Sequence, residues 1–441
     1  MRVTNSMVTN NILLSLNRSK LALSIYEEQL ATGKKIQRPS DDPIIAVRAL
    51  KLRASVNEIE QYRTNAEDAL SWMTVAEKSI SNVIEIVVKR ARSLCVQAAN
   101  GPLGIKERQS IVTELKQLKD QIADEGNVDY AGRHVFTGYK TDKPLTYTEN
   151  AKDDKFTIEE KFGADNIEKV EKVFNSTPPR KGEIARIRVS YSKIKYDATP
   201  PNDKLTVSST PSKQLAINSV NNSTDANAYE PLPGTVNILR DTGEIIFNKD
   251  DLGDIKEINF TYDKEGFENN DLNPIHYFKC TNKDTGETYE NKRDVIKYQV
   301  SYNQNAEINT LGKEFITTDL MRDMEEMINE VGKVKGDGTD YDNLLKDSLR
   351  DKFDKLIGKI DKHKENLLKE QADLGTRMNR VELTITRLED DKLNFTDLMT
   401  KNESIDIAEV IVNMKCQQMV YDSALMSSTK VVQSSLLDFL R

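Results

Sequence analysis

The chain has 441 residues, enough for two to four domains. Apolar residues make up 37%, charged residues 30% and aromatic residues 6%, a balance typical of long surface-exposed helices rather than one large compact core. The net charge of −8 disfavours nucleic acid and anionic membranes as partners. No run of residues is apolar enough to span a membrane, and the first residues lack the apolar core of a signal peptide. Taken alone, these features predict a cytosolic protein, or one exported without a cleaved signal.

The first helix is predicted over residues 5–31, and Gly33 is expected to end it because glycine accepts a left-handed backbone. Apolar residues on this helix form two separate lines, which indicates neighbours on several sides. The two lines run through Met7, Leu14, Leu21 and Ile25, and through Leu13, Leu16, Leu23 and Leu30.

A second helix is expected to start at Asp42-Pro43, where Asp can cap and Pro fits the first turn. It meets no breaker before Gly101-Pro102, which would make it about 85 Å long. Apolar residues follow a three-four spacing from Ile59 to Gln97, interrupted at Arg90, as in a coiled coil.

A third helix is predicted to fold back over residues 106–125, with Ile111, Leu115, Leu118 and Ile122 on its seam. The strand-like residues after it predict a β hairpin near residues 132–146.

In the middle of the chain, the sequence period changes from 3.5 to 2. Alternating residues occur at 187–191 and 205–207, while 235–239 and 244–247 flank a turn that ends in Gly243. A second pair is expected at 275–281 and 288–289. We therefore predict a β-rich insert over 146–310, forming one globular domain or two small ones and facing outward.

The last 130 residues return to the helical period. They predict a short helix over 318–331, a long helix over 341–400 and an apolar helix that ends the chain. The seam of this terminal helix is predicted to include Ile407, Ile411, Met414, Tyr421 and Leu425.

Each arm therefore carries an unpaired apolar seam, and antiparallel pairing of the two arms would bury both. The predicted fold class is mainly α with a β-rich insert, in which the N- and C-terminal arms form a long antiparallel, coiled-coil-like rod. The predicted domains are terminal helices over 1–42 and 402–441, a rod over 43–145 and 311–401, and the outer insert over 146–310.

No residue pattern predicts catalysis, a cofactor or a metal ion. His363 lies on the seam of the long helix and is interpreted as a polar position that sets the helix register. The carboxylates at 337–342 miss the spacing of a calcium loop. His134 and His276 stand alone in strand-like segments, and are interpreted as ordinary surface or sheet residues.

Cys95, Cys280 and Cys416 are far apart and odd in number, which excludes a disulfide framework. Cys95 and Cys416 are expected to be structural thiols within helices, with no adjacent base. The sequence has no phosphate-binding glycine loop and no serine elbow.

Nine short motifs, in order along both arms, resemble those of the flagellin superfamily and, within it, of hook–filament junction proteins. They are LATGKKI (Leu30–Ile36), RPSDDP (Arg38–Pro43), RALKLR (Arg48–Arg53), DALSWM (Asp68–Met73), QAANG (Gln97–Gly101), GRHVFTGYKTDKP (Gly132–Pro144), LGTRMNRVE (Leu374–Glu382), DIAE (Asp406–Glu409) and SSLLDFLR (Ser434–Arg441). The insert matches no pattern that we can name.

This resemblance implies a structural protein that is not an enzyme. In the family, the terminal helices pair as an inner assembly domain, partly disordered in the monomer. Subunits leave the cell unfolded through the flagellar type III apparatus, without a cleaved signal peptide, and act outside it. The implied partners are further copies of the chain in a ring, the first hook-associated protein on the hook side and flagellin on the filament side. An export chaperone is expected at the C-terminal helix.

Apolar residues left over on the terminal helices are predicted to form the contacts between subunits. The predicted interface residues are Leu14, Leu21, Ile25, Ile411, Met414, Leu425, Val432, Leu436, Leu437, Phe439 and Leu440. Three alternatives stay open: a flagellin that forms the bulk filament, a helical effector that binds a partner, and an enzyme housed in the insert.

Overall fold

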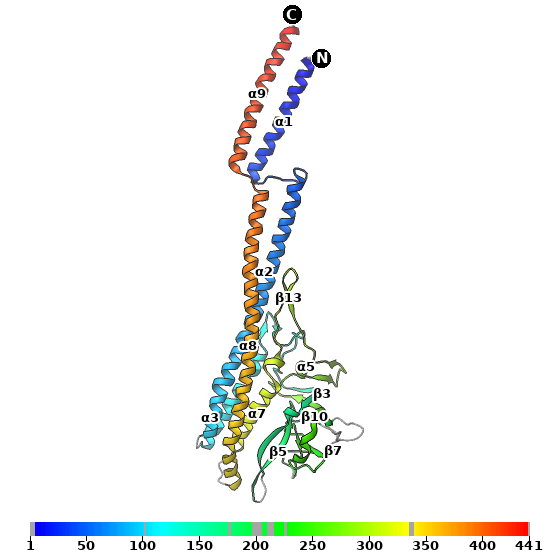
Figure 1. Cartoon of the computed structure of the whole chain (residues 1–441), viewed down its shortest axis with the longest axis vertical. Helices are drawn as coiled ribbons and strands as arrows, with labels where there is room; N and C mark the ends of the chain where they lie inside the picture. Colours follow the sequence, from blue (N-terminus) through cyan, green and yellow to red (C-terminus); the bar gives the residue numbers. More distant parts are fainter. Residues whose placement is uncertain are drawn as a thin grey trace. The chain divides into compact units, whose positions relative to one another are not determined.

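The computed structural model describes residues 5–100, 103–174, 178–195, 205–209, 216–224, 227–334 and 339–439. Long helices occupy both arms and antiparallel strands fill the middle (Figure 1), which confirms the predicted fold class. The chain divides into two compact units. One comprises Met1–Glu67, Gln299–Asn303 and Leu383–Arg441, and the other comprises Asp68–Tyr298 and Gln304–Glu382.

The helices lie close to the predicted positions. They are α1 (Asn5–Thr32), α2 (Pro43–Ile84), the π-helix η1 (Glu85–Ala91), α3 (Arg92–Asn100), α4 (Ile105–Gly126), α7 (Thr318–Lys333), α8 (Asp340–Glu403) and α9 (Ile407–Phe439), with single turns at α5 (Pro274–Tyr277) and α6 (Gly312–Phe315).

The π-helix η1 corrects the predicted seam of the second helix. A π turn accommodates one extra residue, so every later position moves by one on the helix face. Arg90, the predicted interruption, lies within this segment. Beyond it, Cys95 and Ala98 are buried, whereas Gln97, the predicted seam residue, is exposed.

Helices of the second unit pack through the predicted seams. Ile111, Leu115, Leu118 and Ile122 of α4 are all buried, and α4 lies against α7. The Sγ atom of Cys95 in α3 is 3.4 Å from Sδ of Met327 in α7, and burial raises the pKa of this thiol to about 12. This cysteine therefore acts as a packing residue, as the sequence predicted.

Fourteen strands are assigned within the described residues. They are β1 (Asp129–Tyr130), β2 (Arg133–His134), β3 (Ala151–Gly163), β4 (Glu168–Phe174), β5 (Arg180–Arg188), β6 (Leu205–Ser209), β7 (Ala216–Asn221), β8 (Thr235–Leu239), β9 (Glu244–Phe247), β10 (Ile255–Phe267), β11 (Lys279–Asn282), β12 (Thr288–Tyr289), β13 (Lys297–Ser301) and β14 (Gln304–Glu307).

Most of these strands form two five-stranded sheets, in the orders β12-β11-β3-β10-β6 and β4-β5-β9-β8-β7. All neighbours in them are antiparallel except β7 and β8. One buried cluster joins Ile158 and Phe260 of the first sheet to Ile187, Val236 and Phe247 of the second. The two sheets therefore share a single core, as in a β sandwich.

The predicted hairpin of β8 and β9 is present, with Gly243 at a φ of 65° in its turn. In contrast, β3 and β10, the longest strands at 13 residues each, were not predicted. Charged residues fill most of their outward positions and two inward ones. Glu160 is buried and accepts a hydrogen bond from the Tyr262 hydroxyl, and Lys264 is buried and donates to Ser192 O at 2.9 Å.

Two predicted strand positions need correction. The hairpin expected near 132–146 starts earlier, at Asp129, because Ala131 and Gly132 adopt the positive φ angles of a two-residue turn. The predicted strand at 275–281 begins instead as the helical turn α5, since the Asn273 side chain caps Ile275 N and Pro274 follows it.

A buried network of charges holds the sheet containing β5 against α7 and α8. Asp323 of α7 lies at its centre, with Oδ1 2.6 Å from Arg188 and Oδ2 2.8 Å from His363 Nε2. Arg186 contacts both Glu244 and Glu326, each at 2.5 Å. His363 is therefore a polar seam position, as predicted, whose partner comes from another helix.

The carboxyl groups of Asp323 and Glu326 in this network have lowered pKa values. Burial opposes the ionised form of Asp323, but the hydrogen bond with His363 and the charges of Arg188 and Lys359 outweigh it, so the pKa of this carboxyl lies well below its usual range. The same balance lowers the pKa of Glu326 to about 2.

Replacing Asp323 by Asn should cost about 3–5 kcal/mol of unfolding free energy, because Arg188 and Lys359 would keep their buried charges without this partner. Urea unfolding at pH 7 measures the loss. The matched control is Glu268→Gln in the exposed pair with Lys193, which should cost under about 1 kcal/mol.

The depressed carboxyl pKa values stabilise the fold above about pH 4.5, and this contribution is lost as the pH falls toward 2. The effect of Asp323→Asn should therefore shrink at low pH. Similar losses for both variants would contradict this account.

The register shift at η1 predicts opposite outcomes for two neighbouring residues. Ala98→Glu should lower the unfolding free energy by about 2–4 kcal/mol, because a charge would enter a packed seam. Gln97→Glu, on the exposed side, should change it by less than about 0.5 kcal/mol. Thermal and urea unfolding measure the loss for each variant. A larger loss for Gln97→Glu than for Ala98→Glu would show that the seam continues through Gln97 without a shift.

Candidate assembly interface

Helices α1 and α9 pack against each other in the first unit (Figure 1). The end of α1 and the start of α9 meet at a bridge between Lys34 and Ser404, so the two helices run antiparallel. The α9 residues with the least exposure recur at three- and four-residue steps. They are Val410, Met414, Gln417, Tyr421, Ala424 and Ser428.

The observed seam shares Met414, Tyr421 and Ser428 with the predicted one, but Val410, Gln417 and Ala424 take the places of Ile407, Ile411 and Leu425. The last three side chains lie beside the seam and are 60%, 38% and 38% exposed. Close helix packing favours a small side chain such as Ala424 over a broad apolar ridge.

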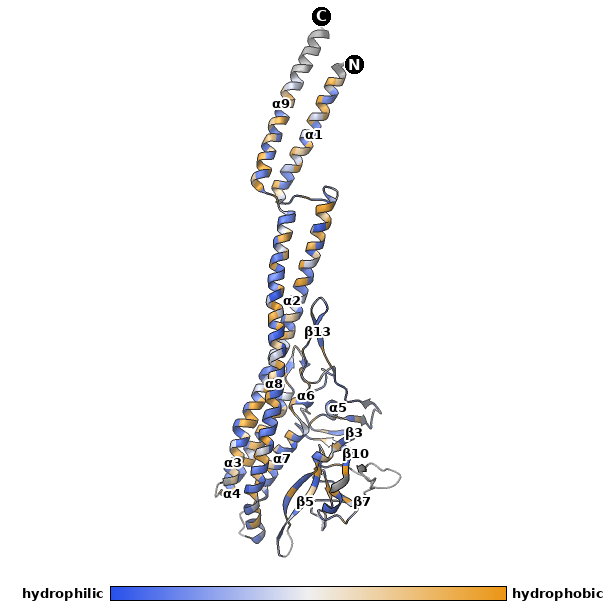
Figure 2. Cartoon of the chain, in the orientation of Figure 1, coloured by the Kyte–Doolittle hydropathy of each residue, from blue (hydrophilic) through white to orange (hydrophobic). Residues whose placement is uncertain are grey.

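Many large apolar side chains of the two helices stay exposed. They are Met7, Leu13, Leu14, Leu21 and Ile25 on α1, and Ile407, Ile411, Val412, Met419, Val420, Leu425 and Met426 on α9. Figure 2 shows the apolar residues of α1 and α9 as orange segments of the ribbon. Leu16, Leu23 and Leu30, on the other predicted line of α1, are half-buried. Of the two lines, then, one is largely left in solvent.

Predicted interface residues fall into three groups. Leu14, Leu21 and Ile25 are more than half exposed, and Met414 is half-buried on the side of α1. Ile411 and Leu425 lie at the edge of the seam. Val432, Leu436, Leu437 and Phe439 belong to the last part of α9, whose side chains lie outside the described residues, as does Leu440 altogether.

A compact joint, which the sequence did not predict, connects the terminal helices to α2 and α8. Gly33, at a φ of 69°, ends α1 by donating from its N–H to Gln29 O at 2.7 Å, and its own carbonyl accepts from Ile405 N at 3.1 Å. Lys35 N donates to Glu403 O at 2.7 Å. The two linkers therefore pair through their backbones.

The side chain of Glu403 is buried at the centre of the joint. Its two carboxylate oxygens accept from Nε and Nη2 of Arg53 at 2.7 and 2.5 Å, a bidentate pair, and Lys34 Nζ lies 3.8 Å away. The hydrogen bond and the charge of Glu403 raise the pKa of Arg53. Such pairs fix orientation as well as distance.

Aspartates start the two helices that leave the joint. Asp42 Oδ1 accepts from the backbone of Ile44 at 2.9 Å and Ile45 at 3.1 Å, which caps α2. Asp406 Oδ1 accepts from Ala408 N at 2.9 Å and caps α9. Four motif residues thus shape the joint, since Gly33 and Arg53 contact its other strand of the chain, while Asp42 and Asp406 cap the helices that leave it.

The remaining histidines lie inside the second unit. His134 Nδ1 is 3.0 Å from Asn127 O in a half-buried position on β2. His276 lies in α5 rather than a strand, with Nε2 3.2 Å from Pro144 O, and burial lowers its pKa to about 3. The interpretation of His276 as a surface or sheet residue was therefore wrong.

Burial raises the pKa of Cys280 to about 12, and Cys416 is exposed on α9. Of the acidic loop at 337–342, the first two residues lie outside the described part, and Asp342 pairs with Lys346 at 2.8 Å. Over the described residues, no helix is long and apolar enough to cross a membrane.

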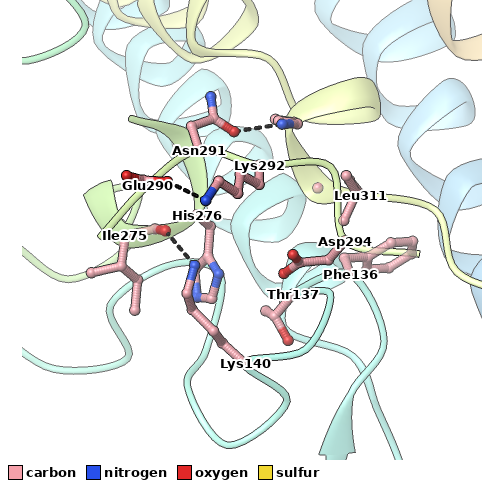
Figure 3. A pocket seen from close by; sticks show the side chains of 12 residues that line it. Phe136, Thr137, Lys140, Ile275, His276, Glu290, Asn291, Lys292, Asp294 and Leu311 are labelled. Atoms are coloured by element: carbon pink, nitrogen blue, oxygen red, sulfur yellow. Dashed lines mark hydrogen bonds and ion pairs between the residues drawn. The ribbon is translucent and has the colours of Figure 1, made fainter. Parts of the chain in front are cut away.

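A shallow pocket of about 20 Å³ lies in the second unit, between His276 and the segment around Asn291 (Figure 3). Its polar groups contact one another: Lys292 pairs with Glu290 and Asn291 accepts from Lys313, each at 2.5 Å. A space of this size holds about one water molecule, far less than a substrate site needs.

Comparison with known proteins gives matches at both ends of the chain. Residues 3–141 match the bacterial flagellin N-terminal helical region, and residues 357–440 match the bacterial flagellin C-terminal helical region. The chain is 32% identical over 143 residues to flagellar hook-associated protein 3 of Escherichia coli strain K12, covering 32% of this chain and 45% of the relative. A flagellin of Clostridium tyrobutyricum is 30% identical over 122 residues, which cover 28% of this chain and 32% of that flagellin.

Each alignment thus spans less than half of the relative. A putative flagellar hook-associated protein of Vibrio parahaemolyticus aligns structurally over 82% of this chain and 100% of its own, with 14% identity and a TM-score of 0.42, too low to carry an argument.

The exposed position of Leu425 makes a prediction for the free monomer. Leu425→Asp should leave the α1–α9 pair as stable as in the wild type, because this side chain is not part of the seam. Val410→Asp, at a buried seam position, should instead destabilise the pair by about 2–4 kcal/mol. Circular dichroism during thermal unfolding of the full chain compares them, and an equal loss for both would show that the seam is misplaced.

Proposed function

Because the chain belongs to the flagellin superfamily, we propose that it is a structural subunit of the bacterial flagellum which joins the hook to the filament. The observation that carries this proposal is the joint, which Gly33 and Arg53 hold together and from which two helices leave, capped by Asp42 and Asp406. These residues belong to the motifs that resemble junction proteins. The name of the Escherichia coli relative, hook-associated protein 3, points to the same role.

The proposed mechanism couples folding to assembly. Isolated helices are marginal in water, and the seam between α1 and α9 is narrow, with most of its described side chains only half-buried. Leu14, Leu21, Ile25 and Leu425 stay exposed in the monomer. Their burial against neighbouring subunits would supply about 25 cal/mol for each Å² of apolar surface removed from water. Together with Ile411, Met414, Val432, Leu436, Leu437, Phe439 and Leu440, they form the proposed assembly interface.

Proposed partners follow from this role. Further copies of the chain would complete a ring, with the first hook-associated protein on the hook side and flagellin on the filament side. A chaperone would cover the C-terminal helix before export through the flagellar type III apparatus, which places the protein outside the cell. In this proposal, 1–42 and 402–441 assemble, 43–145 and 311–401 form the rod, and 146–310 is the outer insert.

A flagellin is the second candidate, because flagellins also match the N-terminal region. Flagellins form the bulk of the filament, so loss of such a subunit would remove the filament itself rather than its attachment. The two roles therefore differ in where flagellin ends up when this protein is missing.

A strain that lacks this protein should make complete hooks without filaments and release flagellin into the medium. Electron microscopy counts hooks and filaments, and an immunoblot of the medium measures flagellin. The wild-type chain should restore filaments, and Leu425→Asp should fail to restore them although the monomer folds. Filaments of normal number in the deletion strain would contradict the junction role, and loss of all flagellin would favour the second candidate.

A further inference from the structure

One outer face of α2 carries both apolar and basic side chains that stay exposed. Ile44, Val47 and Leu50 are 75%, 54% and 60% exposed. Arg48 and Lys51 stand among them, both exposed. Within the described residues neither of these two forms an ion pair. Ala46 and Ala49 in the same turns are buried, so Ile44, Arg48 and Lys51 point away from the packed side of the helix, and Leu50 lies at its edge.

A second outer face, on the last part of α8, carries apolar and acidic side chains. Leu383 and Leu393 are 73% and 72% exposed. At about 100° per residue, Asp390 and Asp397 project from the same side of the helix, and both are exposed. Asp390 forms no ion pair in the described part of the chain, and Asp397 contacts only Lys401 one turn later, at 2.7 Å.

These two faces cannot meet within one chain. Arg53 pairs with Glu403, and Glu60 pairs with Lys392 at 2.5 Å, which fixes α2 and α8 side by side and antiparallel in this unit. Arg63 lies 4.0 Å from Glu389, so the acidic face is level with residues near 63 of α2. The basic face, centred near residue 47, lies about 16 residues away, which is about 24 Å along the helix.

We propose that the basic face of α2 in one copy of this chain docks onto the acidic face of α8 in a second copy. The inference rests on the proposed function and names a surface outside α1 and α9 that would serve it. Each face has leucine or isoleucine side chains, and its charges without an ion pair in the described part of the chain are opposite in sign. These are Arg48 and Lys51 on α2, and Asp390, beside the Asp397–Lys401 pair, on α8. Apolar contact supplies the affinity, and the paired charges select the partner and its register.

The geometry of this contact has a consequence for the assembly. Because the two faces differ, the contact is heterologous, and such contacts generate rings or helices rather than closed pairs. Because the faces are offset along the unit, neighbouring copies would be shifted by about 24 Å along the helix direction. The same contact repeated from copy to copy would therefore give a helical arrangement of copies rather than a flat ring.

Charge exchange tests this docking in the deletion strain. The first variant carries Arg48→Glu and Lys51→Glu, and the second carries Asp390→Lys and Asp397→Lys. Either variant alone should reduce the fraction of cells with filaments at least tenfold, because like charges would face each other between copies. Co-expression of both, or all four substitutions in one chain, should restore filaments to near the wild-type fraction. As a matched control, Lys193→Glu with Glu268→Lys exchanges an exposed pair elsewhere and should have no effect.

Site-specific cross-linking gives a second readout that does not depend on charge. A chain with Lys51→Cys and Asp390→Cys, in a Cys416→Ser background, should form disulfide-linked oligomers in isolated flagella, whereas either cysteine alone should give none beyond dimers. Full function of both charge variants would overturn the inference. It would also be overturned if the two charge variants failed to rescue each other and the double-cysteine chain formed no such oligomers. If the charge variants function while Leu425→Asp does not, the docking fails and the proposed function stands. If the wild-type chain itself restores no filaments, both fail.

Discussion

The bidentate pair between Arg53 and Glu403 is the interaction on which the first unit depends. The chain leaves one pair of helices and enters another through two short linkers, and loose linkers would let the terminal helices point anywhere. Glu403 restricts the orientation of the linkers, because its buried carboxylate binds Arg53 while its backbone carbonyl accepts a hydrogen bond from Lys35 N. A guanidinium–carboxylate fork constrains orientation in a way that an apolar contact does not. Gly33 and Asp406 then fix where one helix ends and the next begins.

Helical periodicity predicted the long helices almost to the residue, because each carries an apolar seam over most of its length. Two features of these seams were not predicted, for a physical reason. The π-helix at Glu85–Ala91 changes the period itself, and only Arg90 marked it, as an interruption of the seam. The seam of α9 shares Met414 and Tyr421 with the predicted one, but close packing against α1 favours Ala424 over Leu425. Periodicity locates a stripe, but the partner decides which edge of the stripe is buried.

The joint and the buried charges were harder to predict because their partners are far apart in sequence. Arg53 and Glu403 are separated by 350 positions. Asp323, Arg188 and His363 come from two helices and a strand. A histidine on a helical seam indicated a polar contact, but the sequence could not show that the partner would be an aspartate on a neighbouring helix. Long strands such as β3 escaped for a related reason, since the charges on them find partners only across the sheet.

The second unit and the terminal helices are packed in different ways. In the second unit, large apolar side chains such as Phe353, Phe260 and Phe136 are fully buried, and the charges between the sheet and the helices are paired. The terminal helices reverse this arrangement, since Leu14, Leu21 and Met426 remain exposed. A monomer gains little from such a pair of helices, because the entropy of ordering them is offset only by a narrow seam. In the proposed function, association would bury this exposed apolar surface, so that the ends of the chain would gain most of their stability on assembly rather than on folding of the single chain.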